Sequence, residues 1–129
     1  MGAFAAHLCS RGVDVSGSDG ELYPPMSDVL AQAGIRVFTG YRASNLDSLN
    51  PSEDLVVVGN VIRADNPEVR AAQERKFGLV SLPEFMERYF LQTTRNLIIA
   101  GTHGKTTTTS LLAHVLRAAG EDPSYFVGG

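Results

Sequence analysis

The feature that most constrains the fold is a pair of short, uninterrupted apolar runs that each end at glycine. Residues 55–58 read LVVV and stop at Gly59, and residues 97–100 read LIIA and stop at Gly101. Strands without alternation of apolar and polar residues are typical of parallel sheets, whose two faces are both covered. Helical patterns separate the runs, so the sequence predicts strand–helix–strand crossovers and an α/β fold.

The remaining elements are predicted from periodicity and from start and stop signals. The clearest start is at Asn66, which suits a helix cap, with Pro67 at the first helical position and Glu68 in the first turn. In the first 90 residues we expect helices over residues 2–10, 25–33, 67–76 and 82–90, and strands over residues 13–16, 35–38, 55–58 and 79–81. Gly17-Ser18-Asp19 is interpreted as a turn that closes the first of these strands.

A polar stretch at residues 92–95 separates two parts of the chain. The sequence predicts residues 1–92 as a Rossmann-like parallel sheet that lacks its first strand, because the first helix comes without the strand and glycine-rich turn that should precede it. Residues 93–129 are predicted as an opening strand–helix unit, with a strand at 97–100 and a helix that ends at Gly120. Apolar strand edges seek partners, so we expect this tail to dock on the first part or on a second copy of the chain.

Composition excludes several classes of protein. The net charge is −3 and the isoelectric point is near 5.5, which gives no support to a nucleic-acid partner or an anionic membrane surface. The single cysteine, Cys9, cannot form an internal disulfide, so a cytoplasmic setting is expected. No apolar run approaches the roughly 20 residues that span a bilayer.

The strongest chemical signal follows the second apolar run. Glycines allow backbone N–H groups to curl around a phosphate, and the next helix adds free N–H donors and the positive end of its dipole. A lysine there reaches the outer phosphates of a nucleotide, and a hydroxyl next to it binds Mg²⁺. The sequence therefore predicts a phosphate-binding loop, or P-loop, for a nucleotide and Mg²⁺. Its residues are Gly101, Thr102, His103, Gly104, Lys105, Thr106 and Thr107, with Lys105 as the catalytic residue and Thr106 as the magnesium ligand.

Plainer interpretations remain for parts of this loop. The usual motif has four residues between its two glycines, whereas here Ile99 stands where the first glycine would be. A glycine-rich turn with an exposed lysine is the structural alternative. His103 could be merely a polar loop residue, and Thr108 and Thr109 are interpreted as structural.

Polar residues also follow two predicted strands of the first part. Ligands of open parallel sheets bind beyond the carboxyl ends of the strands. Ser18 and Asp19 lie at one such end, and Gly59 and Asn60 lie at another. An acid at the end of the second strand can accept hydrogen bonds from ribose hydroxyls, although Asp19 and Asn60 could equally cap turns.

With these motifs in hand, the chain resembles the N-terminal part of the Mur ligases, the ATP-dependent enzymes that form amide bonds in peptidoglycan synthesis. GVDVSGSD resembles the second strand of the family's UDP-binding domain, and VVVGNVIRADNPEV resembles its switch-point strand, loop and helix. IIAGTHGKTTTTSLLAHVLRAAGEDPSYFVGG resembles the opening of the central ATPase domain, and the family's shorter glycine spacing accounts for Ile99.

The resemblance implies roles for the singled-out residues. Lys105 would contact the β- and γ-phosphates of ATP, and Thr106 would bind Mg²⁺. Ser18, Asp19, Gly59 and Asn60 would line the cleft for UDP-N-acetylmuramate. The γ-phosphoryl group would pass to the muramoyl carboxylate, and an amine would then attack the acyl phosphate.

Two kinds of amine are open within the family. Some members use L-alanine and others use the peptide L-alanyl-γ-D-glutamyl-meso-diaminopimelate. The segments GSDGELYPPMSDVL, FTGY and VVVGN are more similar to the peptide-using, murein-recycling members, so the peptide is expected.

The family also sets expectations about extent. Its members have several hundred residues, so we expect this chain to be an N-terminal fragment that does not catalyse by itself. A free-standing UDP-sugar-binding module without chemistry and a simple P-loop phosphotransferase are the competing hypotheses.

Overall fold

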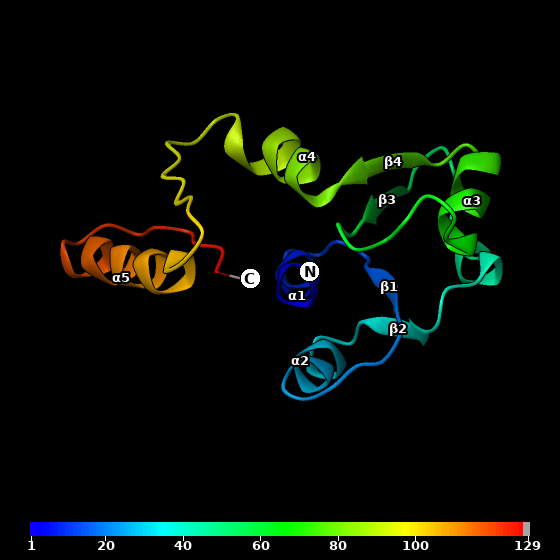
Figure 1. Cartoon of the computed structure of the whole chain (residues 1–129), viewed down its shortest axis with the longest axis horizontal. Helices are drawn as coiled ribbons and strands as arrows, with labels where there is room; N and C mark the ends of the chain where they lie inside the picture. Colours follow the sequence, from blue (N-terminus) through cyan, green and yellow to red (C-terminus); the bar gives the residue numbers. More distant parts are fainter. Residues whose placement is uncertain (128–129) are drawn as a thin grey trace. The chain divides into compact units, whose positions relative to one another are not determined.

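The computed structural model describes residues 1–127, and the chain divides into two compact units, Met1–Thr93 and Thr94–Gly129. The first unit alternates helices and strands along the chain (Figure 1). In order, its elements are α1 (Gly2–Ser10), β1 (Ser16–Asp19), α2 (Met26–Gln32), β2 (Arg36–Thr39), the 3₁₀ turn η1 (Ala43–Leu46), β3 (Leu55–Val58), α3 (Pro67–Glu74), β4 (Gly78–Ser81), α4 (Leu82–Met86) and the π-helical turn η2 (Glu87–Leu91).

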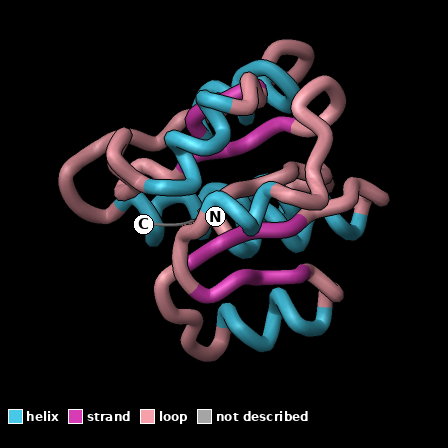
Figure 2. The backbone as a smooth tube through the Cα atoms, turned by 90° about the vertical axis from the view of Figure 1, so that its right-hand side faces the viewer, coloured by secondary structure: helices cyan, strands magenta, loops and turns pink. Residues whose placement is uncertain are grey.

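The strands form two parallel pairs, each connected through a helix. β1 pairs with β2, so that Ser16 lies opposite Arg36 and Asp19 opposite Thr39. β3 pairs with β4, with Leu55 opposite Gly78. Figure 2 shows the two pairs as separate sets of magenta tubes. The predicted α/β fold with parallel strands is confirmed, but the described strands form two two-stranded sheets instead of one continuous sheet.

The small core lies where α3 packs on η1 and on the second strand pair. Ala71 and Ala72 of α3 are buried against Leu46 and Phe77. Three partly buried residues complete this cluster: Leu49, Val56 and Leu79. Two alanines on one turn let the helix approach the strands closely, which a larger side chain would prevent.

Helix α1 contacts elements of both halves of the first unit. It packs on α2 so closely that a Cβ on Gly2 would lie 2.5 Å from Sδ of Met26. On another side its Phe4 ring meets the rings of Phe85 and Phe90, with centroids 5.9 and 5.3 Å apart, edge to face. Such pairs contribute about 0.5–1.5 kcal/mol each beyond area burial. α1 therefore connects the β1–α2–β2 half to the chain that follows β4.

Local signals set several helix starts. The Asn66 side chain accepts hydrogen bonds from the N–H groups of Glu68 and Val69, as predicted for a cap. At the start of α4, Ser81 and Glu84 form a capping box that the sequence analysis missed, although its Ser-x-x-Glu signature was present. Hydrogen bonds from Ser81 hold the pKa of the Glu84 carboxyl below its ordinary value.

The first predicted strand was misplaced. Residues 13–15 are not part of a strand, and β1 instead runs through Ser16–Asp19, which had been interpreted as partly turn. The predicted helix over residues 67–76 ends at Glu74, two residues early. The helix predicted over residues 82–90 is α-helical only to Met86, and the π-helical turn η2 continues it to Leu91. The other predicted elements of this unit agree within one or two residues. Pairing with β2 decides the placement of β1, because backbone hydrogen bonds to a neighbour can outweigh weak strand propensity.

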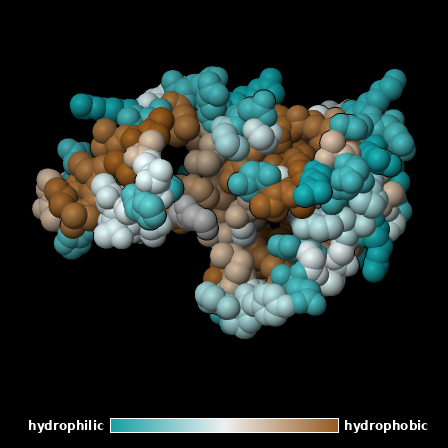
Figure 3. Space-filling model, viewed as in Figure 1, coloured by the Kyte–Doolittle hydropathy of each residue, from teal (hydrophilic) through white to brown (hydrophobic). Residues whose placement is uncertain are grey.

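The second unit consists of an extended stretch, the helix α5 (Lys105–Ala118) and the chain that follows it. The strand predicted at residues 97–100 is wrong, because this stretch forms neither strand nor helix in the described chain. Ile98 is 80% exposed and Leu97 is 57% exposed. A strand needs a hydrogen-bonded neighbour, and α5 offers none. Leu111, Val115 and Phe126 of this unit are exposed large apolar residues. Figure 3 shows apolar surface over this part of the chain.

Within residues 1–127, none of the helices has both the length and the apolar character needed to cross a membrane.

We expect replacement of the α3 cap, Asn66→Ala, to lower the free energy of unfolding by about 1 kcal/mol, because two backbone N–H groups lose their acceptor. Urea denaturation followed by circular dichroism measures the effect. The matched control is Gln73→Ala on the exposed side of the same helix, which should change stability by less than about 0.5 kcal/mol. Equal losses for the two variants would contradict the capping role.

Candidate functional site

The predicted phosphate loop lies at the start of α5 in the second unit. Gly104 has φ +75° and immediately precedes the helix, and its carbonyl accepts the first helical hydrogen bond from the N–H of Thr108 at 2.9 Å. A positive φ of this size favours glycine over residues with a Cβ. The N–H groups of the first helical turn have no partner within a helix, so this end presents free donors and the positive pole of the dipole.

Lys105 is the first residue of α5 and folds back over the loop. Its Nζ donates a hydrogen bond to the carbonyl oxygen of Gly101 at 2.8 Å. The contact brings both ends of the Gly101–Gly104 turn together and places an ammonium beside the free backbone donors. The loop therefore combines backbone N–H groups and a cation on one exposed turn.

The threonines after Lys105 differ in what their hydroxyls do. Thr109 donates to the carbonyl of Lys105 at 2.8 Å, a local backbone contact that agrees with a structural role. Thr106 and Thr107 are exposed, and their hydroxyls have no hydrogen-bond partner within residues 1–127. A hydroxyl oxygen at the first turn is a suitable ligand for Mg²⁺, which retains several waters and binds substrate phosphates as well. Thr106 fits that role as one ligand among several.

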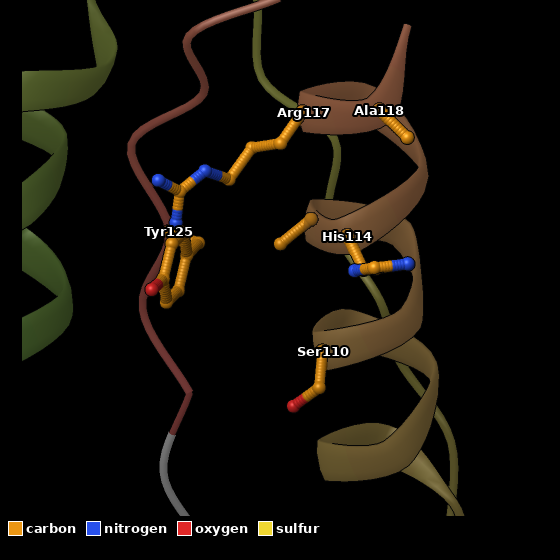
Figure 4. A pocket seen from close by; sticks show the side chains of 6 residues that line it. Ser110, His114, Arg117, Ala118 and Tyr125 are labelled. Carbon is orange, nitrogen blue, oxygen red and sulfur yellow. The ribbon is translucent and has the colours of Figure 1, made fainter.

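Thr102 and His103 are exposed on the same turn. The structure thus places all seven predicted loop residues on one continuous segment. A separate open pocket of about 530 Å³ lies farther along α5. Figure 4 shows Ser110, His114 and Arg117 on the helix, with Tyr125 on the facing segment. None of the predicted loop residues lines this pocket.

In the first unit, the carboxyl ends of β1 and β2 meet side by side. The N–H of Gly40 donates to the carbonyl of Asp19 at 2.7 Å, which continues the strand pairing past its end. The Asp19 carboxylate accepts from the N–H of Gly20 at 2.7 Å and from the hydroxyl of Tyr41 at 3.4 Å. Asp19 is exposed, so its other carboxylate oxygen faces solvent or a ligand.

The pKa of the Tyr41 phenol is raised where the ring lies beside Asp19. Burial raises the pKa of its phenol, and the negative charge of Asp19 raises it further, with a smaller contribution from Glu68. The phenol donates its proton to the Asp19 carboxylate.

Ser18 joins the end of β1 to the start of α3. Its hydroxyl donates to Oε1 of Glu68 at 2.7 Å and accepts from Nδ2 of Asn45 at 3.0 Å. The same Asn45 nitrogen also donates to the carbonyl of Gly40 at 3.0 Å. Sequence reasoning missed Asn45 and Glu68. Glu68 had a sufficient local explanation in the first turn of a helix, and nothing in the sequence near Asn45 marks it.

Gly59 and Asn60 lie in the turn after β3, which is closed by a hydrogen bond from the N–H of Ile62 to the carbonyl of Gly59 at 3.0 Å. A Cβ on Gly59 would lie 3.1 Å from Sδ of Met1, so the glycine permits a close approach of the chain start. Asn60 is exposed. Within residues 1–127, no hydrogen bond joins this turn to Ser18 or Asp19.

Comparison with known proteins finds relatives among the Mur ligases. The family model described as "Mur ligase family, catalytic domain" matches residues 1–93. The UDP-N-acetylmuramate–L-alanyl-γ-D-glutamyl-meso-2,6-diaminoheptandioate ligase of Escherichia coli K12 is 39% identical over the whole chain, which spans 28% of that protein. The UDP-N-acetylmuramate–L-alanine ligase of Paenarthrobacter aurescens is 45% identical over 99% of the chain, which spans 27% of that protein.

Solved structures give the same result. The chain is similar to the crystal structure of the UDP-N-acetylmuramate:L-alanyl-γ-D-glutamyl-meso-diaminopimelate ligase from Neisseria meningitides, with a TM-score of 0.91 and 40% sequence identity. The match covers all of this chain and 39% of the Neisseria chain. That of the UDP-N-acetylmuramate–alanine ligase from Thermotoga maritima has a TM-score of 0.82 and 33% identity, and this chain covers 29% of it.

The family model accounts for residues 1–93 of the 129, and relatives of both amine specificities match the remainder as well. The chain belongs to the Mur ligase family.

Proposed function

We propose that the chain supplies the ATP phosphate-binding loop and part of the UDP-N-acetylmuramate site of an ATP-dependent amide-forming ligase. The observation that carries the proposal is the turn at the start of α5, where Lys105 and the free N–H groups after Gly104 converge. The relatives whose names specify a ligase reaction match the whole of this turn. The chain spans less than a third of the length of those relatives, so the reaction belongs to a longer protein under this proposal.

In this proposal the loop binds the triphosphate electrostatically. Backbone N–H groups between Gly101 and Gly104 hold the phosphate oxygens, and the Lys105 ammonium reaches the β- and γ-phosphates. Thr106 contributes its hydroxyl to the Mg²⁺ that accompanies ATP. Negative charge moves between oxygens during phosphoryl transfer, and fixed donors stabilise it without reorganising.

The first unit, residues 1–92 in the sequence prediction, serves in this proposal as the UDP-sugar-binding domain. Its contribution is the edge where β1 and β2 end, with Ser18 and Asp19, together with the turn at Gly59 and Asn60. Residues 93–129 serve as the start of the ATPase domain. The muramoyl carboxylate would take the γ-phosphoryl group of ATP, and the amine would displace phosphate through a tetrahedral intermediate.

For the amine we propose the peptide L-alanyl-γ-D-glutamyl-meso-diaminopimelate. The segments GSDGELYPPMSDVL, FTGY and VVVGN support it, and the 40% identity with the solved peptide ligase from Neisseria meningitides exceeds the 33% with the solved alanine ligase from Thermotoga maritima. The 45% identity with the alanine ligase of Paenarthrobacter aurescens favours L-alanine as the second candidate.

Lys105→Ala should weaken binding of MgATP by about 10- to 100-fold, because a charge-assisted contact to the phosphates is lost. Affinity for UDP-N-acetylmuramate should stay within about twofold, since its site lies in the other unit. Titration calorimetry on the 129-residue chain measures both.

The matched control is Lys76→Ala, because Lys76 and Lys105 are the two lysines of the chain. This control removes the same charge from the turn after α3 and should leave both affinities unchanged. Equal loss of ATP affinity in the two variants would show that the loss comes from the change in net charge and not from a contact of Lys105 with the phosphates. Equal loss of both ligands in Lys105→Ala would contradict two separate sites.

The 129-residue chain by itself should release no phosphate from ATP above the buffer rate, with or without UDP-N-acetylmuramate and amine. The loop contributes phosphate binding, whereas the described residues hold no group of three or more His, Cys, Asp or Glu side chains that could complete a metal site. A malachite-green phosphate assay measures this. Turnover that depends on the muramoyl substrate would show that the chain is a complete ligase.

A ligase that contains this chain should release phosphate faster with the tripeptide than with L-alanine, both at equal concentration. The control omits the amine and gives the uncoupled rate. Faster release with L-alanine would transfer the assignment to the alanine ligases, and no amine dependence would contradict the proposed reaction.

A further inference from the structure

The open pocket along α5 has no part in the proposed function. Its volume of about 530 Å³ lies within the range of small-molecule sites. It is formed by α5 and the segment that follows the helix, and all of its lining residues belong to the second unit (Figure 4). The described lining residues are Ser110, Ala113, His114, Arg117, Ala118 and Tyr125.

The polar residues that α5 contributes lie on one face of the helix. Ser110, His114 and Arg117 are separated by four and three positions, so each lies about one turn from the next. The span from Ser110 to Arg117 is about 10 Å, which is the length of a small organic molecule. Between them, the small side chain of Ala113 leaves room for a ligand, and this alanine is buried.

The charge in this pocket is positive. The Arg117 guanidinium is always charged and presents its N–H donors as a flat fork, and the His114 imidazole adds at least one more donor. None of the described lining residues is an Asp or a Glu. Within residues 1–127, no carboxylate forms an ion pair with Arg117, so its fork is available to an anion.

The negative pole of the α5 dipole lies at this end of the helix and opposes an anion. Two of the carbonyls that create it are already paired, because Gly120 donates to the carbonyl of Arg117 and Glu121 donates to that of Leu116, both at 3.0 Å. At an exposed helix end, the dipole effect is weaker than a hydrogen bond between charged partners. The guanidinium therefore determines which charge the pocket accepts.

The wall opposite the helix is aromatic. Tyr125 is 57% exposed, and Figure 4 shows its ring on the facing segment with the Arg117 side chain extending toward it. Both an aromatic ring and a guanidinium plane favour stacking against a flat group. A phosphate is less suitable than a carboxylate, because phosphates favour the free backbone N–H groups of a helix start, and this pocket lies toward a helix end.

We propose that this pocket binds an aromatic carboxylate. The carboxylate accepts hydrogen bonds from Arg117 and His114, and the aromatic ring of the ligand packs against Tyr125. A free aromatic acid and a peptide that ends in an aromatic residue both carry this chemistry. The inference is independent of the proposed function, because the pocket shares no residue with the phosphate loop at Gly101–Thr107.

The first test titrates the 129-residue chain with 2-naphthoate and follows the backbone amides by ¹H–¹⁵N NMR. The amide signals of residues 110–118 should shift with a saturable dependence on concentration. Neutral 2-naphthamide should bind at least about tenfold more weakly, because it lacks the charge that pairs with Arg117. Cyclohexanecarboxylate should bind about threefold more weakly, because it lacks the flat ring.

Variants separate the two contacts. Arg117→Gln should weaken 2-naphthoate about tenfold and leave 2-naphthamide unchanged. Tyr125→Leu should weaken 2-naphthoate about threefold and leave cyclohexanecarboxylate unchanged. The matched control is Arg95→Gln, which removes the same charge from an exposed position of the same unit outside the pocket and should change neither affinity. Circular dichroism establishes that each variant is folded.

Two further ligands distinguish the sources of the carboxylate. Tighter binding of N-acetyl-phenylalanine than of 3-phenylpropanoate would support a peptide C-terminus, and the reverse order or equal binding would support a free acid. Equal affinity for 2-naphthoate and 2-naphthamide would overturn the proposal, as would full affinity in Arg117→Gln. Shifts confined to residues 101–107 would place the acid at the phosphate loop and would also overturn it, and so would the absence of any shift.

Discussion

The arrangement depends on one constraint, which is that neighbouring parallel strands need a crossover connection. A hairpin cannot join them, so the chain returns through a helix to the same end of the pair. Both strands then end at the same edge, as the hydrogen bond from Gly40 to the carbonyl of Asp19 shows. Polar residues that are distant in sequence therefore lie together at this edge. In this chain they are Ser18, Asp19, Tyr41 and Asn45.

The two strand pairs of the first unit share no backbone pairing, so side chains connect them. On one side, Phe4 of α1 meets the rings of Phe85 and Phe90. On another, Ser18 reaches Glu68 at the start of α3. The first contact is apolar and tolerates small shifts, whereas the second is directional and short. The hydrogen bond from Ser18 to Glu68 therefore fixes the position of the end of β1 relative to the start of α3 more tightly than the aromatic contacts can.

Sequence predicted the elements whose signals are local. Asn66 and Pro67 marked the start of α3 because a cap acts within one turn, and the LVVV run marked β3. Elements that depend on a partner were mispredicted. β1 runs through Ser16–Asp19 because β2 pairs with it, and residues 97–100 form no strand despite high propensity because α5 provides no neighbour. Glu68 escaped notice because the helix dipole already explained an acid there, and only the folded chain places Ser18 beside it.

The two proposed sites have opposite hydrogen-bonding character. The turn at Lys105 offers donors, which suit phosphate oxygens. The edge at Asp19 and Glu68 offers acceptors, which suit hydroxyls. ATP and a UDP-sugar both carry phosphates and ribose, so shape alone discriminates poorly between them. Under the proposed function, the donors at the Lys105 turn would select the phosphates of ATP, whereas the acceptors at the Asp19 edge would select hydroxyl groups, so that the two nucleotides would not compete strongly for one site.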